Sequence, residues 1–382
     1  MKHSDLPLEI ITDVLSRLPI LNILRLKCVC KPWLELIESP EFAKLHLSKS
    51  SPGLLVHQLQ SCESSFFNLS GFEDELEVES HELNYIPVAN FDIKIFHGRP
   101  VIVGSVNGFL CLRSRLPFDY LYICNPITHE YISLQTPERV SRLPFTVSHG
   151  FGVSTNGGQY KVVVTYQESE RDPTGVCARD IPRADSHVYT LGTAGTWRCI
   201  ASSPPLHYPC YSIGASVNGN LHWLVGDLQD SQVISCLDLD DELFSTFSAP
   251  PLPGYSSKCL ASLVVLRNCL SVCDNTSDKD IVVWIMKDYG AQESWTREFV
   301  ISKIPNLAGT CIDAVSPIKV FENGDILMTW GDYYLFYYSD RSKTTSRIDI
   351  FERENCWTIE AVLHVPALVS LTGFARESVN SF

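Results

Sequence analysis

The chain opens on a stretch that predicts its first structural unit: Leu6-Pro7-Leu8-Glu9-Ile10-Ile11-Thr12-Asp13-Val14-Leu15-Ser16-Arg17-Leu18-Pro19. Large aliphatic residues recur in it at helical spacing, so the pattern predicts an amphipathic helix. Asp5 precedes the pattern as a candidate N-cap, and Pro7 suits the first turn of a helix. Pro19 ends the helix, because proline lacks the backbone N–H that the next turn needs. The predicted apolar face consists of Ile10, Ile11, Val14, Leu15 and Leu18.

Two more helices are expected before residue 38, which makes three in this unit. Asn22 is a candidate cap for the second helix, and Pro32 can open the third. Ser39-Pro40 then restarts a further turn that runs through Phe42 and Leu45. A unit of about forty residues can bury only a modest share of its surface. Its apolar faces must therefore be covered either by the following domain, as an ordinary helical cap, or by another protein.

The rest of the chain reads as short strands between turn signals. Asn-Gly pairs and related turns, the strongest short-range hairpin signals, recur at Asn107, Asn156, Asn218, Asn268 and Asn323. Successive members of this series are 49, 62, 50 and 55 residues apart. A repeat near 50 residues with about four strands is typical of a β-propeller with kelch-like blades. Two stacked β-sandwiches are the alternative architecture.

Such a ring should close on itself, because each blade buries its faces only against its neighbours. Strands at Leu54–Leu59 and Ile359–Val365 are candidates to complete one blade from the two ends of the chain. Six blades are favoured, with five or seven open. The predicted fold class is therefore α+β multidomain: a small three-helix domain at residues 1–50, then an all-β propeller-like domain at residues 51–382.

The net charge and the distribution of apolar residues exclude some classes of binding partner. The net charge of −14 argues against a nucleic-acid backbone as the main partner. No run approaches the roughly 18 apolar residues of a membrane span, and Met1 leads into the helical pattern without a signal peptide. We therefore expect no nucleic-acid and no membrane partner, and a place in the cytoplasm and/or the nucleus. The 14 cysteines are then mostly small buried apolar groups. The acidic run from Glu63 to Glu82 is either a docking site for a basic partner or a solvated loop.

Motifs for catalysis and metal binding are missing from the sequence. It has no Gly-x-Ser-x-Gly elbow, no His-Glu-x-x-His and no phosphate-binding glycine loop, and its cysteine pairs lack zinc spacing. We expect no cofactor and no metal. His222 and Trp223 are interpreted as packed blade residues, and Trp284 and Trp295 as blade-core aromatics rather than a sugar platform. The acids Asp238, Asp240, Asp241 and Glu242 fall at a turn, where solvation is the first interpretation and calcium binding the second.

The opening stretch, together with Leu26-Lys27-Cys28-Val29-Cys30-Lys31-Pro32-Trp33, resembles an F-box. The resemblance implies that this segment docks on the Skp-type adaptor of a cullin ubiquitin ligase, and reaches the cullin scaffold and the RING subunit through that adaptor. A few buried aliphatic anchors and one Trp would carry most of the binding energy. Some of these side chains must instead hold the helices together. The residues that the resemblance implies as adaptor-binding are Leu6, Pro7, Ile10, Ile11, Leu15, Leu18, Pro19, Leu24, Val29 and Trp33.

The strand region resembles the F-box-associated interaction domain of plants. The segments that carry this resemblance are Gly104–Leu112, Ile123–Thr128, His149–Val153, Val217–Trp223 and Val283–Thr296. They imply a C-terminal kelch-like domain that binds an unknown target protein, so that the chain is a non-catalytic substrate receptor of a plant ubiquitin ligase. Such a receptor raises effective concentration and does no bond chemistry itself. The alternative is a β-propeller that binds a small molecule or glycan, with the F-box as a regulatory handle.

Overall fold

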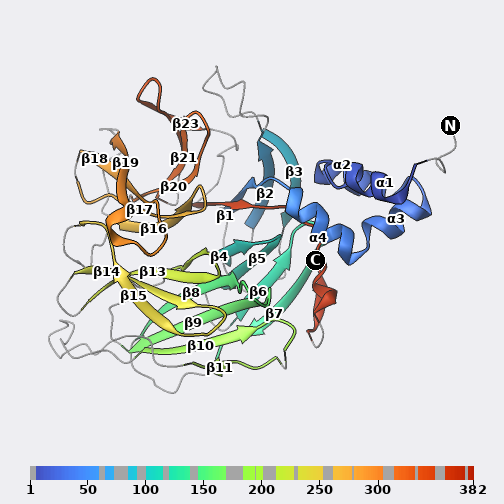
Figure 1. Cartoon of the computed structure of the whole chain (residues 1–382), viewed down its shortest axis with the longest axis horizontal. Coiled ribbons are helices and arrows are strands. Elements are labelled where there is room, and N and C mark those ends of the chain that lie inside the picture. Colours follow the sequence, from blue (N-terminus) through green and yellow to red (C-terminus); the bar gives the residue numbers. More distant parts are fainter. Residues whose placement is uncertain are drawn as a thin grey trace.

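Four helices precede a ring of six β-sheets in the computed structural model of the chain (Figure 1). The structure describes residues 6–59, 65–72, 85–92, 100–114, 120–137, 145–168, 184–193, 195–200, 212–227, 231–252, 261–277, 279–303, 314–331, 334–348, 358–374 and 377–382. Most of the acidic run and all of residues 169–183 lie outside these residues. The helices are α1 (Leu8–Leu15), α2 (Ile20–Leu26), α3 (Lys31–Ile37) and α4 (Pro40–Lys49).

Prolines open α1 and α2. Pro7 and Pro19 occupy the N-cap positions with φ of −57° and −55°, and neither helix has a side-chain cap. The prediction that Asn22 caps α2 is wrong, because Asn22 lies inside the helix that starts at Ile20. Asp5 lies outside the described residues. Proline has a fixed φ and no N–H to satisfy, so it begins a helix without a capping side chain.

The helical unit has four helices, not the three that the sequence predicted. The turn expected after Ser39-Pro40 is a helix of 10 residues. Ser39 caps it by accepting a hydrogen bond from the Phe42 backbone N–H at 3.2 Å, and Pro40 stands in the first turn. Phe42, Ala43 and His46 are buried on one side of α4. Tertiary packing of that face supports a helix that its local sequence marked only as a turn.

The six sheets are the blades of a propeller, which confirms the favoured count. Blade 1 has the order β24 (Thr358–His364), β1 (Gly53–Leu59), β2 (Ser65–Phe72) and β3 (Tyr85–Asp92). Blade 2 contains β4 (Pro100–Val106), β5 (Phe109–Ser114), β6 (Tyr120–Asn125) and β7 (Glu130–Gln135), and β25 (Val379–Ser381) pairs with β7. Blade 3 contains β8 (Phe145–Val153), β9 (Tyr160–Glu168), β10 (Ala184–Thr190) and β11 (Arg198–Cys199).

The remaining blades repeat this plan. Blade 4 contains β12 (Ala215–Val217), β13 (Asn220–Gly226), β14 (Gln232–Asp238) and β15 (Phe244–Ser248). Blade 5 contains β16 (Ala261–Leu266), β17 (Cys269–Asp274), β18 (Asp280–Met286) and β19 (Trp295–Ser302), with the short 3-10 helix η1 (Gln292–Ser294) before β19. Blade 6 contains β20 (Val315–Val320), β21 (Ile326–Trp330), β22 (Tyr334–Ser339) and β23 (Thr344–Ile348). A second 3-10 helix, η2 (Leu371–Gly373), follows β24.

Turn residues set the repeat, as predicted. Asn107 and Gly108 join β4 to β5 with φ of 48° and 88°, and Asn218 and Gly219 join β12 to β13 with φ of 53° and 73°. Positive φ at both central residues is the requirement of a tight two-residue hairpin, and Asn-Gly meets it at low cost. Each such pair returns the chain from the first to the second strand of a blade.

The ring closes inside blade 1. β1 pairs antiparallel with β24 along its whole length, from Gly53 opposite His364 to Leu59 opposite Thr358. This confirms the predicted closure from the two chain ends. β24 takes the inner position of the blade, where it contacts the inner strands β4 and β20 of the neighbouring blades. Apolar clusters fill the spaces between neighbouring blades, and the cluster between blades 1 and 2 also includes helix residues such as Leu15 and Phe42. The helical domain is therefore seated over the junction of blades 1 and 2.

The chain after β24 crosses from the helical side to blade 3, a path that the sequence did not predict. Asn125, which is fully buried, donates from Nδ2 to the carbonyl oxygens of Ala367 (3.0 Å) and Val369 (2.7 Å). Glu130 accepts from the Leu371 backbone N–H at 2.7 Å. β25 then adds a strand to blade 2. Asn125 thus fixes a segment that follows it by more than 240 residues in the sequence.

Candidate functional site

The first candidate site is an apolar surface on the helical domain. Ten large apolar side chains are highly exposed among the described residues, and half of them fall between residues 6 and 29. These are Leu6 (62% exposed), Leu8 (62%), Ile10 (47%), Val14 (54%) and Val29 (54%). The other five are spread along the propeller from residue 66 to residue 300. A concentration of exposed aliphatic groups in so short a segment makes it a candidate protein-interaction surface.

The residues predicted to contact an adaptor divide into three groups by exposure. The exposed ones are Leu6, Pro7, Ile10, Pro19 and Val29, the half-buried ones are Ile11, Leu18, Leu24 and Trp33, and Leu15 is buried. The half-buried group packs against the same apolar cluster as Leu15. Leu15 is 3% exposed, so it stabilises the helical domain and offers no surface to a partner in this conformation. We name the exposed set Leu6, Leu8, Ile10, Val14 and Val29 the α1 face.

Polar contacts fix α1 against α4. Lys49 donates from Nζ to the Asp13 carboxylate at 2.7 Å and to Ser16 Oγ at 2.8 Å. Arg17 makes two hydrogen bonds with the same carboxylate, and these bonds, with that of Lys49, lower the pKa of Asp13 to about 2. His46 of α4 lies 3.0 Å from the Leu18 carbonyl oxygen, and burial lowers its pKa. These contacts fix α1 to α4, while Leu8, Ile10 and Val14 of the α1 face stay exposed on the helix and Leu6 and Val29 stay exposed outside it.

The acidic turn after β14 holds two blades together. Asp240 accepts hydrogen bonds from Thr155 and Asn156 of blade 3. Glu242 accepts from Lys161 Nζ at 2.8 Å, and Lys161 is itself 4% exposed. Burial opposes ionisation of Glu242, but hydrogen bonds from Arg198 and Lys161 keep its pKa below the usual value. The interpretation as a solvated turn is therefore wrong for Asp240 and Glu242, which tertiary contacts pair with blade 3. Asp238 accepts from the backbone N–H groups of Asp240 and Asp241 within the turn, and Asp241 is exposed, as the interpretation expected.

His222 is packed in a polar contact and is not set up as a base. Its Nδ1 donates to the Ala215 carbonyl oxygen (3.1 Å), so its Nε2 accepts from the Tyr289 hydroxyl (2.7 Å). Burial lowers the pKa of His222 to about 4. Cys236 Sγ lies 3.5 Å from the same Nε2, and burial raises the pKa of that thiol, so neither group is activated. Trp223 is 1% exposed and Trp295 9% exposed, in agreement with their expected packing.

The described residues hold no group of three or more His, Cys, Asp or Glu side chains placed to bind a metal ion. Eight of the described cysteines are free thiols, and Cys111, Cys124, Cys236 and Cys273 are buried as expected. Cys28, Cys30 and Cys199 are exposed, against the expectation of burial. Among the helices that the structure describes, none combines the length and the apolarity that a membrane crossing requires.

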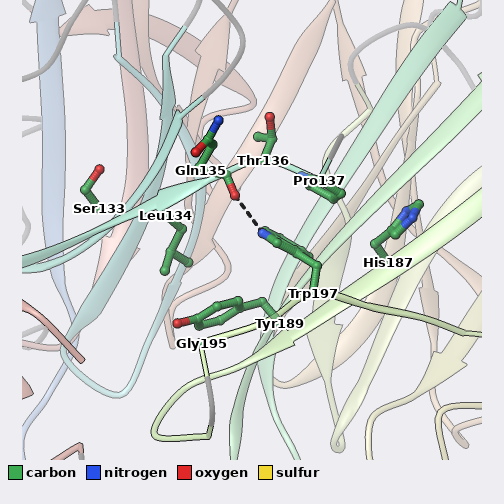
Figure 2. A pocket seen from close by; sticks show the side chains of 9 residues that line it. All are labelled: Ser133, Leu134, Gln135, Thr136, Pro137, His187, Tyr189, Gly195 and Trp197. Carbon is green, nitrogen blue, oxygen red and sulfur yellow. Dashed lines mark hydrogen bonds between the residues drawn. The ribbon is translucent and has the colours of Figure 1, made fainter. Parts of the chain in front are cut away.

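The second candidate site is a pocket of about 470 Å³ on the rim between blades 2 and 3, which we name the rim pocket. Figure 2 shows it between the end of β7 and the side chains of β10 and of the segment before β11. Among the residues that the structure describes, its lining includes no Asp, Glu, Lys or Arg. The principal ones are Ser133, Leu134, Gln135, His187, Tyr189 and Trp197.

Hydrogen bonds between the blades hold the walls of the rim pocket. Trp197 donates from Nε1 to the Gln135 carbonyl oxygen at 2.7 Å, as the dashed line in Figure 2 shows. Tyr189 donates from its hydroxyl to the Glu377 carboxylate at 2.8 Å. The rings of Tyr189 and Trp197 lie 5.5 Å apart. The aromatic wall is thus fixed to blade 2 and to the C-terminal segment before any ligand binds.

Sequence reasoning missed parts of both sites. Leu8 and Val14 belong to the exposed α1 face but were not among the predicted contact residues. Val14 was available from the helical pattern, since it stands one turn after Ile10. The rim pocket gave no local signal, because its lining residues come from three separate segments of the chain.

Comparisons with known proteins agree with this architecture. A family model described as F-box domain matches residues 3–45, and one described as F-box associated beta propeller domain follows it over residues 56–367. The chain is 30% identical over 370 residues to the F-box protein At3g07870 of Arabidopsis thaliana, covering 88% of this chain and 85% of that protein. It is 26% identical to the F-box protein At1g67130 of the same plant (90% and 72% covered) and 25% identical to the F-box/kelch-repeat protein At3g23880 (85% and 85%).

The four helices with their outward apolar face, the closed six-bladed ring and the two family matches lead to one conclusion. This chain belongs to the family of F-box proteins that carry an F-box-associated β-propeller domain.

Proposed function

We propose that this protein is the target-recognition subunit of a cullin-type ubiquitin ligase. The F-box docks on a Skp-type adaptor, through which the cullin scaffold and the RING subunit are recruited, and the propeller binds the protein to be ubiquitinated. The subunit does no bond chemistry itself. It holds a target near a charged conjugating enzyme and so raises the effective concentration of the reacting groups.

The observation that carries this proposal is the α1 face. Its members are 47–62% exposed, although the helices beside them pack on blades 1 and 2. Removing an exposed aliphatic side chain from water contributes roughly 1.5–3 kcal/mol before ordering costs. A handful of such anchors is enough for a stable interface. The helices share an apolar cluster with blades 1 and 2, so the propeller is held in a fixed orientation relative to the F-box.

The test measures binding of the purified full-length chain to a Skp-type adaptor. The variant Ile10→Asp places a charge on the α1 face, in the first turn of a helix where an acidic residue is tolerated. We expect its affinity to fall at least 30-fold. The matched control is Val300→Asp on β19, where the replaced side chain is equally exposed (48%) but lies on the propeller. The control should bind like the wild type. A wild-type chain that does not bind, or an Ile10→Asp chain that binds normally, contradicts the proposal.

A further inference from the structure

The crevice between blades 2 and 3 already holds an extended segment of the chain itself. β25 lies antiparallel to β7, with Ser381 opposite Glu130 and Val379 opposite Ile132. The Val379 side chain packs into the apolar cluster that Ile132, Leu134 and Tyr189 share between the two blades. This edge of blade 2 therefore accepts an extended polypeptide, with every second side chain directed into the crevice.

Within the described residues, the chain's own segment pairs with only part of this edge. β25 pairs with residues 130–132, whereas β7 continues to Gln135. Before Val379 the segment turns away, since Glu377 accepts hydrogen bonds from the Tyr189 hydroxyl (2.8 Å) and the Gly192 backbone N–H (2.9 Å). The rim pocket begins where β25 stops, and Ser133, Leu134 and Gln135 line it. It is the continuation of an interface that the molecule already uses.

Backbone groups point into this continuation. The Gln135 carbonyl oxygen accepts from Trp197 Nε1, so it is directed out of the sheet edge and not toward β6. The N–H and C=O of one strand residue point to the same side, and the direction alternates along the strand. The N–H of Gln135 and the backbone groups of Ser133 therefore also face outward, where a bound main chain can reach them.

The described side chains that line the rim pocket include the apolar Leu134 and the aromatic Tyr189 and Trp197. Leu134 is 5% exposed and points from β7 toward Tyr189, while the Trp197 indole closes the other side (Figure 2). In an antiparallel pair, a residue opposite Leu134 places its own side chain on the same face. Because the described lining residues include no Asp, Glu, Lys or Arg, a charged side chain seated among them would lose its hydration and find no ionic partner there.

We propose that the rim pocket is the site at which the receptor holds its target, by an extended, uncharged peptide segment. One apolar side chain of that segment is seated against Leu134 and the Trp197 ring, and its main chain bonds to the outward N–H and C=O of Ser133 and to the outward N–H of Gln135. This inference rests on the proposed receptor function and names where on the propeller, and by what chemistry, the target is recognised.

The probe is a phage-displayed library of random twelve-residue peptides, panned on the purified full-length chain without the adaptor. Enriched sequences are synthesised with a fluorescent label and titrated by polarisation. The blocking variant is Ser133→Arg, which fills an exposed position at the mouth with a charged side chain. The matched control is Thr246→Arg, an exposed residue of β15 in the outermost strand of blade 4. A second variant, Trp197→Ala, removes the aromatic wall, with thermal unfolding measured to verify that blade 3 is folded.

We expect peptides with an apolar residue flanked by uncharged ones, and at least a tenfold loss of affinity in Ser133→Arg and in folded Trp197→Ala, with no loss in Thr246→Arg. Methylating the peptide nitrogens one at a time should weaken binding at alternate positions. A library that enriches nothing, or peptides that bind Ser133→Arg like the wild type, overturns the site. Adaptor affinity is measured on the same samples, so a failure of the F-box proposal is seen separately, as loss of adaptor binding by the wild type.

Discussion

The helical domain and the propeller differ in how far their large apolar side chains are exposed to solvent. Within residues 6–29, five large apolar residues are at least 47% exposed, while across the described part of the propeller the blade interiors are buried and the inter-blade spaces filled. The propeller can do this because a ring gives every blade two neighbours. The helical unit is too small to cover itself and has the ring on one side only. The propeller therefore covers its apolar side chains within its own fold, whereas the helical domain leaves several of them in solvent, where the proposed adaptor would cover them.

The largest expected effect comes from opening the ring. Deleting residues 358–382 removes β24, the inner strand of blade 1, and exposes the edges of β1 and the inter-blade cluster shared with blade 6. Because the whole net stability of a domain is about 5–15 kcal/mol, we expect no folded monomer. Circular dichroism and size-exclusion chromatography measure this. The control deletes only residues 377–382, which removes β25 and should leave a folded ring. If the first truncation also stays folded, the propeller does not depend on closure.

A smaller effect separates the two sides of α1. Leu15→Ala empties a buried site in the cluster that joins the helices to blades 1 and 2, and we expect a loss of about 2–5 kcal/mol in the stability of the helical domain. Leu8→Ala trims a side chain that is 62% exposed and should change stability by about 0.5 kcal/mol or less. Hydrogen exchange of the α1–α4 amides reports both. Equal losses for the two variants would show that the α1 face is structural, and that would remove the main contrast between the domains.

The smallest effect is a difference in acid sensitivity. Burial lowers the pKa of His222 to about 4 and those of His149 and His364 to about 3, and all three belong to the propeller. In the unfolded chain a histidine has a pKa near 6.5, so the unfolded state binds protons more readily in this window. The histidine contribution to stability is therefore full above about pH 6.5 and falls as the pH decreases toward 4, by up to about 1.4 kcal/mol per pH unit for each histidine.

Thermal unfolding followed by tryptophan fluorescence between pH 7 and pH 5 checks this slope. In His222→Asn the amide can still donate to the Ala215 carbonyl oxygen but no longer titrates, so its midpoint should depend less on pH than that of the wild type. A wild-type midpoint that does not change between pH 7 and pH 5 would contradict neutral burial of these rings.

Local chemistry made much of the fold predictable. The repeat of hairpin asparagines gave the blade count, and Asn107-Gly108 and Asn218-Gly219 adopt the positive φ values that such turns require. Closure by the strands at Leu54–Leu59 and Ile359–Val365 was confirmed: β1 pairs with β24 on one edge, while its neighbour in sequence, β2, takes the other. The fourth helix was missed, since Ser39-Pro40 signals a start but not a length. β25 was missed because Val379-Asn380-Ser381 has no strand pattern of its own and pairs only through β7.

A small amphipathic helical unit followed by a β-propeller of about six repeats could be predicted from the amino-acid sequence. Helical periodicity and hairpin turns depend on residues that are close together in the chain, so both leave a local pattern. The tertiary structure alone decided that Leu15 is turned inward while Ile10 and Val14 are left outside, and that Asp240 and Glu242 bind blade 3. It alone brought Leu134, Tyr189 and Trp197 together at the rim. These outcomes depend on which surfaces meet when the ring closes, and contacts between distant segments leave no mark in the local sequence pattern.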